Sequence, residues 1–122
     1  MGVYYQAKNT KLNKRKGLWG GRAYLTSYCQ ADLLGRIHKA AGAPLAKTND
    51  ELFIRPPYTM TADDARQAAA KIKAVTLGQW AHLLMGQTFH GLVTADYSAI
   101  DLQNFALAWV EFLELSKGYT AD

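Results

Sequence analysis

The sequence predicts one compact domain of the α+β class, residues 1–122, in which a small two- or three-stranded antiparallel sheet near the N-terminus packs with about four helices. Three observations predict it. The length is close to the commonest size of a single domain. β-branched and aromatic residues gather near the N-terminus, where they favour strands. Apolar residues recur at helical spacing through much of the remaining chain.

Two strands are predicted at the N-terminus and a third candidate lies further along the chain. Val3 to Ala7 reads as a short strand. Asn9 to Gly21 is polar, basic and rich in glycine at its end, which is typical of a loop. Ala23 to Thr26 is the return strand. Leu52 to Arg55 is the further candidate, and the Pro56-Pro57 pair that follows removes two backbone donors.

The first two helices are predicted from their capping residues. Ser27 and Gln30 have the spacing of a capping box, and a helix begun there stops at Gly42. Thr61 and Asp64 have the same spacing, and a stripe of mostly small apolar residues follows them to Val75. Small residues on that stripe predict close packing against a neighbouring element.

Two more helices complete the prediction. One runs from Leu77 to Thr88, and the last begins at Ser98 with Asp101 and is closed by Gly118. This last helix is apolar on nearly every side, so more than one side must be buried. Either it is central in the fold, or it contacts another chain in a homodimer or in a partner's groove.

The composition of the chain indicates the cellular compartment in which the protein is expected. The longest apolar segment, Phe105 to Leu115, carries Glu111 and Glu114, so no membrane span is predicted. The first residues lack the order of charge, apolar run and cleavage site that a signal peptide shows. A single cysteine, Cys29, fits a reducing compartment. We therefore expect a cytoplasmic protein.

Charge is distributed unevenly. Residues 1–31 contain six Lys or Arg and no Asp or Glu, although the whole chain has a formal charge of only +4. Cations beside aromatic rings are what single-stranded nucleic acid requires, because the cations follow the phosphates and the rings stack on bases. The predicted contacts with an anionic partner are Lys11, Lys14, Arg15, Lys16 and Arg22, with Trp19 and Tyr5 as the stacking rings. The alternative is a solvated basic loop beside ordinary core tyrosines.

Two binding functions follow from these patterns. The first is a small non-catalytic binding protein whose basic N-terminal face engages nucleic acid or a nucleic-acid-handling protein. The second is an inhibitor or adaptor that blocks a protein surface, by analogy in size with phage counter-defence proteins. In that case Trp80, Trp109 and Phe112 are the candidate contacts.

An enzyme is the third hypothesis. Cys29 lies near a predicted helix start, where the helix dipole favours a thiolate, and a histidine would have to act as its base. The alternative for Cys29 is a small buried apolar residue. His38, His82 and His90 lack the spacing of a metal-ligand pair, so each is expected to be a partly exposed histidine. The glycine-rich segment around Trp19 does not match a phosphate-binding loop, so no cofactor or metal is predicted.

Overall fold

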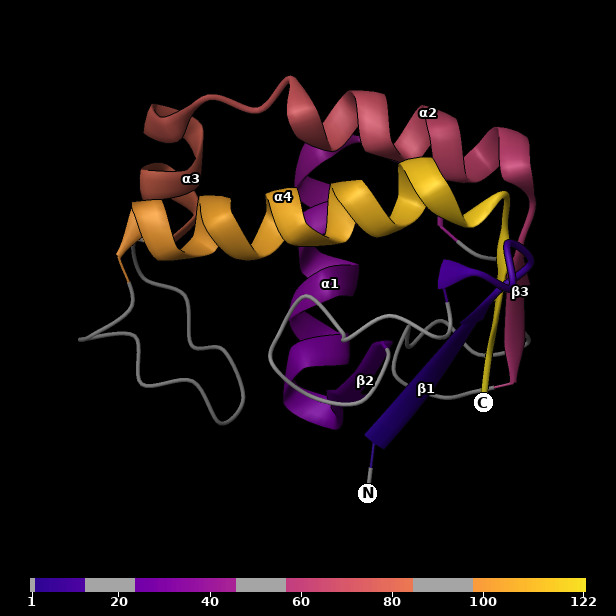
Figure 1. Ribbon diagram of the computed structural model, residues 1–122. Coiled ribbons are helices and arrows are strands. Elements are labelled where there is room, and N and C mark those ends of the chain that lie inside the picture. The colour runs from indigo at the N-terminus through magenta and orange to yellow at the C-terminus, as the bar shows by residue number, and fades with distance from the viewer. Residues whose placement is uncertain (1, 13–23, 46–56, 85–97) are drawn as a thin grey trace.

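Four helices and four strands make up the part of the chain that the computed structural model describes, residues 2–12, 24–45, 57–84 and 98–122 (Figure 1). The helices are α1 (Tyr28–Ala41), α2 (Ala62–Lys73), α3 (Leu77–Leu84) and α4 (Ala99–Ser116). The strands are β1 (Gly2–Ala7), β2 (Tyr24–Ser27), β3 (Tyr58–Met60) and β4 (Tyr119–Ala121). The predicted α+β class is confirmed.

The strands form one antiparallel sheet in the order β2-β1-β4-β3. Tyr5 lies opposite Tyr24 on one side and Ala121 on the other, and Ala121 in turn lies opposite Tyr58. The sheet has more strands than the two or three expected, because β3 and β4 join it. Both strands have three residues, too few for an alternating pattern to stand out in the sequence.

Local capping chemistry starts two of the helices where the sequence predicts. The Thr61 hydroxyl accepts a hydrogen bond from the Asp64 backbone N–H at 3.2 Å before α2. Before α4, Ser98 accepts from the Asp101 N–H at 3.1 Å, and the Asp101 carboxylate accepts from the Ser98 N–H at 3.0 Å. Such a reciprocal pair satisfies donors that the first helical turn leaves free.

The turn after α4 feeds the chain directly into β4. Lys117 and Gly118 both have positive φ, at 58° and 95°. A Cβ on Gly118 would lie 2.8 Å from the Met60 carbonyl oxygen, so only glycine fits between α4 and the start of α2. The predicted end of the helix at Gly118 is confirmed, and the reversal places β4 between β1 and β3.

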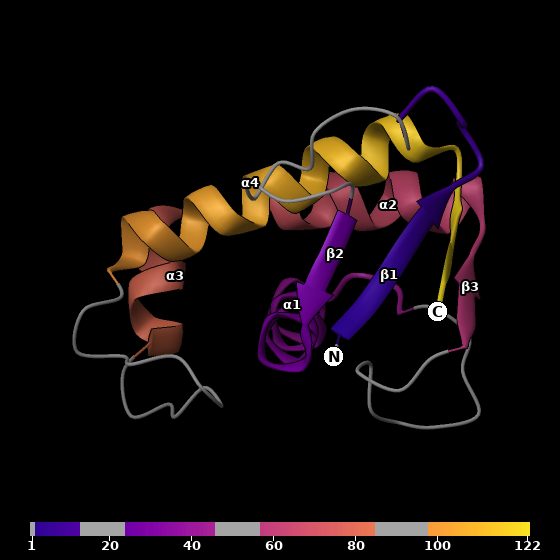
Figure 2. The same ribbon diagram turned by 60° about the horizontal axis from the view of Figure 1, so that its bottom comes forward.

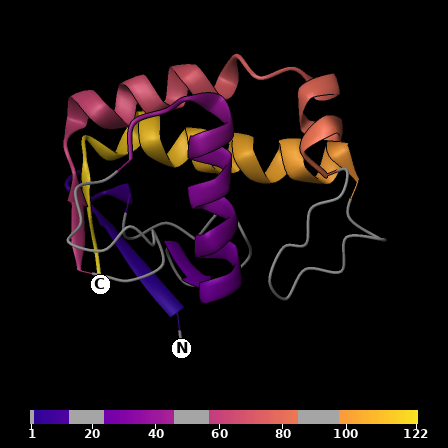
Figure 3. The ribbon, with the colours of Figure 1, turned by 180° about the vertical axis from the view of Figure 1, so that it is seen from behind.

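The helices are arranged around α4. Figure 2 shows α2 beside α4, the sheet near the C-terminal end of α4 and α3 near its N-terminal end. Seen from behind, α1 crosses the direction of α2 and α4 (Figure 3). The small-residue stripe of α2, namely Ala65, Ala68, Ala69 and Ile72, is buried, as the sequence predicts for close packing. None of the helices in the described ranges is long and apolar enough to cross a membrane.

Some expectations fall partly or wholly outside the described residues. The candidate strand at Leu52 to Arg55 is one of them, as is the part of the predicted third helix beyond Leu84. Directly after the Pro56-Pro57 pair, where the sequence suggests only the end of a strand, the structure starts β3 at Tyr58.

Candidate functional site

The beginning of the basic segment, residues 8–22, is tied to the C-terminal end of α4. The backbone N–H groups of Lys8 and Asn9 donate to the carbonyl oxygens of Gly118 and Ser116, both at 2.9 Å. The Asn9 side-chain amide donates to the Leu115 carbonyl at 2.9 Å. The last carbonyl groups of a helix lack partners within the helix, so these contacts stabilise both segments. Leu12 is buried and holds the segment against the core.

Two cations of this segment lie in the described part, Lys8 and Lys11, and both are exposed. Among the described residues, no ion pair involves either of them. Exposed Lys117 belongs to the same end of α4, where cations interact favourably with the helix dipole. The other predicted contacts, Lys14, Arg15, Lys16, Trp19 and Arg22, lie outside the described residues.

The choice of Tyr5 as a stacking ring is corrected by its burial. Tyr5 is 0% exposed, whereas its neighbour Tyr4 is half-buried. Successive side chains of a strand point to opposite faces of the sheet, so only one of two adjacent tyrosines can face outward. The sequence motif, two tyrosines in a row, carried no information about which one that is. As the protein is folded, Tyr4 is the ring that can meet a ligand.

Trp80, Trp109 and Phe112 also lie in the core, which corrects their assignment as interface residues. Their exposed fractions are 1%, 0% and 0%. Trp109 stacks on Phe112 with ring centroids 5.1 Å apart, and meets Tyr5 edge-on at 5.0 Å. Large aromatic rings bury more surface than other side chains, so they serve the core first. A partner would have to meet other residues.

His38 is buried, in contrast to the partly exposed histidine expected from the sequence. Its Nε2 accepts a hydrogen bond from the Trp109 indole N–H at 2.9 Å, and its Nδ1 lies 2.9 Å from the Pro44 carbonyl oxygen. A carbonyl only accepts, so Nδ1 carries the proton and the ring is neutral. Burial lowers the pKa of His38 to about 4, against the opposing effect of the Pro44 hydrogen bond. His38 therefore joins α1 to α4.

Three buried tyrosines crowd the inner face of the sheet. The Tyr58 hydroxyl donates to the Tyr5 hydroxyl at 3.3 Å, and the Tyr119 hydroxyl has no hydrogen-bond partner among the described residues. Burial raises the pKa of each of these phenols, because the phenolate would lose its hydration. The phenols therefore stay neutral, and their rings act as core side chains.

The described residues show no cluster of reactive groups that would support the enzymatic hypothesis. Cys29 lies in the first turn of α1, as expected, but its side chain is outside the described part. His38 uses both ring nitrogens in the core and is not placed to act as a base. His82 is exposed, as predicted, and His90 is outside the described residues. Within the described ranges, no three His, Cys, Asp or Glu side chains are close enough to hold a metal ion.

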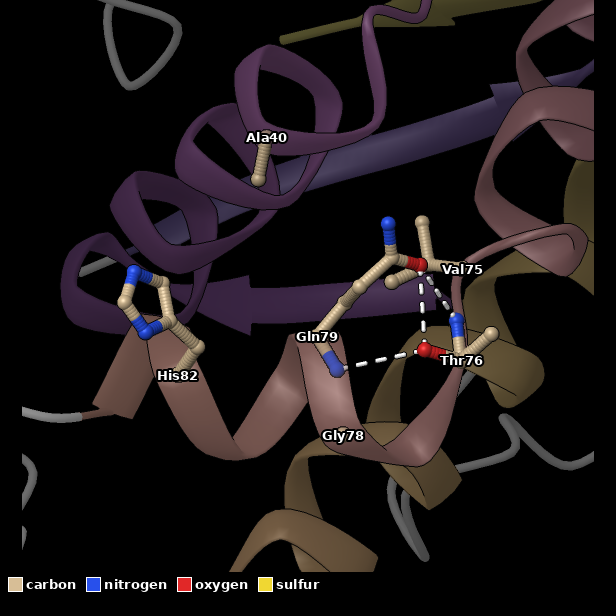
Figure 4. A pocket seen from close by; sticks show the side chains of 6 residues that line it. All are labelled: Ala40, Val75, Thr76, Gly78, Gln79 and His82. Atoms are coloured by element: carbon tan, nitrogen blue, oxygen red, sulfur yellow. Dashed lines mark hydrogen bonds between the residues drawn. The ribbon is translucent and has the colours of Figure 1, made fainter.

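A pocket of about 430 Å³ lies between α1 and the start of α3 (Figure 4). It is lined by Ala40, Val75, Thr76, Gly78, Gln79 and His82. The Gln79 side-chain oxygen accepts from the Thr76 N–H at 2.8 Å and from its hydroxyl at 3.2 Å. Those bonds cap α3. Because the polar groups of the lining are exposed, the pocket does not hold a preorganised set of ligand contacts.

The solvent-facing side of α4 carries exposed apolar side chains. Ile100 and Leu107 are 57% and 42% exposed, and a spacing of seven residues places them on one side of the helix. The central position expected for α4 is confirmed for its buried side, and another side leaves large apolar side chains in solvent. Contact of that side with another chain stays a prediction.

Comparisons with protein-family models, with curated proteins and with solved structures gave no match.

Proposed function

We propose that the protein is a small non-catalytic binding protein whose basic N-terminal face engages an anionic partner, either nucleic acid or a nucleic-acid-handling protein. The observation that carries this proposal is the first 31 residues, which hold six cations and no carboxylate side chain. A local excess of one charge attracts the opposite charge even when the whole molecule is nearly balanced.

The described part of the basic face supports the proposal. Lys8 and Lys11 are exposed where β1 leaves the sheet, and Lys117 joins them at the same end of α4. Two carboxylates of α2 and α4 are engaged in ion pairs, since Asp63 contacts Arg66 and Glu114 contacts Lys73. Among the described residues, the C-terminal end of α4 thus offers exposed ammonium groups on Lys8, Lys11 and Lys117.

The test is fluorescence anisotropy with labelled single- and double-stranded DNA and RNA over a salt series. Binding through phosphates weakens with salt, and the slope counts the contacts. The variant Lys14/Arg15/Lys16→Glu should lose binding. Its charge-matched control is Lys39→Glu/Gln67→Glu/Lys71→Glu/Ala81→Glu, on exposed positions of α1, α2 and α3. Binding that survives in the first variant would contradict the proposal, and an equal loss in both would reduce it to a net-charge effect.

A second candidate function, an inhibitor or adaptor, is favoured by the apolar side chains of α4. Ile100 and Leu107 take the place of the buried Trp109 and Phe112 as candidate contacts. A protein partner captured by the wild type should be lost with Ile100→Ser/Leu107→Ser. The matched control Gln67→Ser/Ala70→Ser changes exposed positions of α2 and should retain it. Recovery of nucleic acid without a stoichiometric protein would count against this candidate.

A further inference from the structure

The outer face of the sheet carries exposed and half-buried side chains, and exposed Lys8 follows β1 at one end of it. Four of its side chains are Tyr4 and Gln6 on β1, Thr59 on β3 and Thr120 on β4, here called the outer sheet face. Gln6 and Thr59 are exposed, and Tyr4 and Thr120 are half-buried. Their strand neighbours are buried on the opposite face, as the alternation of a strand requires.

The four side chains of the outer sheet face are neutral, with polar groups around one ring. Exposed Asp122, which exchanges two backbone hydrogen bonds with Tyr4, adds one carboxylate beside that ring. Gln6 lies opposite Thr120, which lies opposite Thr59, so an amide and two hydroxyls form a row across three strands. Such groups donate and accept hydrogen bonds with base edges. Tyr4 is on β1, an inner strand of the sheet, and its ring offers a surface on which a base can stack.

Positive charge is placed at one end of this face. Lys8 follows β1 immediately, four residues after Tyr4, which is about 13 Å along an extended chain. The chain then continues into the basic segment. A ring and neutral polar groups with the exposed cation Lys8 at one end match a strand of bases joined by phosphates. An acidic peptide would instead need its cations on the face itself.

We propose that the outer sheet face binds single-stranded nucleic acid, with Tyr4 stacking on an unpaired base and Lys8 and Lys11 contacting phosphates. The inference rests on the proposed function and narrows its partner. A single strand is required because bases in a duplex stack on each other and are not available to a ring on a sheet.

The experiment measures binding of labelled oligothymidine and oligouridine to the full chain by anisotropy, over a salt series. Tyr4→Thr should weaken binding by about 5- to 150-fold, the range of one stacked base, without changing the salt slope. Tyr4→Phe keeps the ring and should bind like the wild type. Lys8→Gln should reduce the slope by about 0.7, the value for one phosphate contact of a single strand.

A second pair of variants keeps the inference testable if Tyr4→Thr does not fold. Gln6→Glu/Thr59→Glu places two carboxylates on the outer sheet face and should abolish binding at moderate salt. Gln67→Glu/Ala70→Glu adds the same charge on exposed positions of α2 and should leave binding largely intact. Thermal melting checks that each variant is folded.

The outcomes separate this inference from the proposed function. Normal binding by Tyr4→Thr and Gln6→Glu/Thr59→Glu, together with loss of binding by Lys14/Arg15/Lys16→Glu, would support the proposed function. The same result would show that the outer sheet face is not the binding site. Tighter binding of polyglutamate than of oligothymidine would overturn the inference in favour of an acidic protein surface. Absence of binding to either probe at low salt would overturn both.

Discussion

The inner and outer faces of the sheet alternate along the same strands and yet have opposite properties. On the inner face Tyr5, Tyr58 and Tyr119 are at most 3% exposed and pack against one another and α4. On the outer face Gln6 and Thr59 are exposed. Among the described strand tyrosines, the buried rings therefore serve stability. Of the two adjacent tyrosines of β1, it is Tyr4, turned outward by the strand alternation, that is accessible to a ligand.

The largest expected difference between the two faces is in the effect of truncating two adjacent tyrosines of β1, one at a time. Tyr5→Ala should lower the free energy of unfolding by about 3–5 kcal/mol, as expected for a large ring removed from a packed core. Tyr4→Ala should lower it by about 1 kcal/mol or less, because its ring is half in solvent. Urea denaturation followed by circular dichroism measures both. Equal losses would mean that the two faces are not distinct.

The stability of the buried core should also depend on pH, because His38 is buried there. The unfolded chain takes up a proton near pKa 6.5, whereas the folded protein does so only near about 4. Stability is therefore fully present above about pH 6.5 and falls as the pH drops toward 4. The total loss is about 3 kcal/mol at about 1.36 kcal/mol per pKa unit.

Urea denaturation at a series of pH values checks this dependence on His38. His38→Gln should flatten the decline between pH 6.5 and 4, even if it lowers stability overall. The control His82→Gln, at an exposed position, should keep the wild-type slope. If the free energy of unfolding of His38→Gln still falls between pH 6.5 and 4, groups other than His38 cause the decline.

A smaller effect distinguishes two hydroxyls on the inner face. Tyr58→Phe removes the donor to the Tyr5 hydroxyl and should lower the free energy of unfolding by about 1 kcal/mol. Tyr119→Phe removes a buried hydroxyl without a partner among the described residues, so it should be neutral or stabilising by about 1 kcal/mol. Thermal denaturation of the two variants side by side measures the difference. Destabilisation by Tyr119→Phe would indicate that its hydroxyl is satisfied.

The smallest expected effect is on nucleic-acid binding at the outer sheet face. Asp122 exchanges two backbone hydrogen bonds with Tyr4, so its carboxylate lies next to the ring proposed to stack on a base. Asp122→Asn should strengthen binding of oligothymidine about two- to threefold at low salt by removing repulsion of the phosphates. The gain should shrink at high salt, where the interaction is screened. Weaker binding of oligothymidine by this variant would indicate that the nucleic acid does not lie beside Asp122 and Tyr4.

Prediction from sequence succeeded where the determining contacts are local. Ser98 and Asp101 are three residues apart, so the capping box before α4 can be read directly from the chain. Thr61 and Asp64 work in the same way before α2. It failed for β4, whose partner strands β1 and β3 lie far away in the chain, because nothing within three residues encodes such pairing.

For the candidate site as well, the sequence predicted what depends on composition and did not predict what depends on packing. The sequence alone determined the concentration of cations before residue 32, since charge is a property of composition. It also pointed to the tyrosines of β1, but not to the one that faces solvent. Trp109 and Phe112 were candidates for an interface because apolar aromatic residues serve cores and interfaces alike. Only packing distinguishes the two.

By itself, then, the sequence determined the α+β class, the starts of α2 and α4 and the uneven charge, because each depends on residues near one another or on composition. Packing between distant elements makes Tyr5 buried and leaves Tyr4 partly exposed, and it buries His38 between Trp109 and Pro44. Those outcomes depend on elements that meet only when the chain folds. Which side of a strand is covered is set by the helix that packs on it, and α4 covers the side of Tyr5.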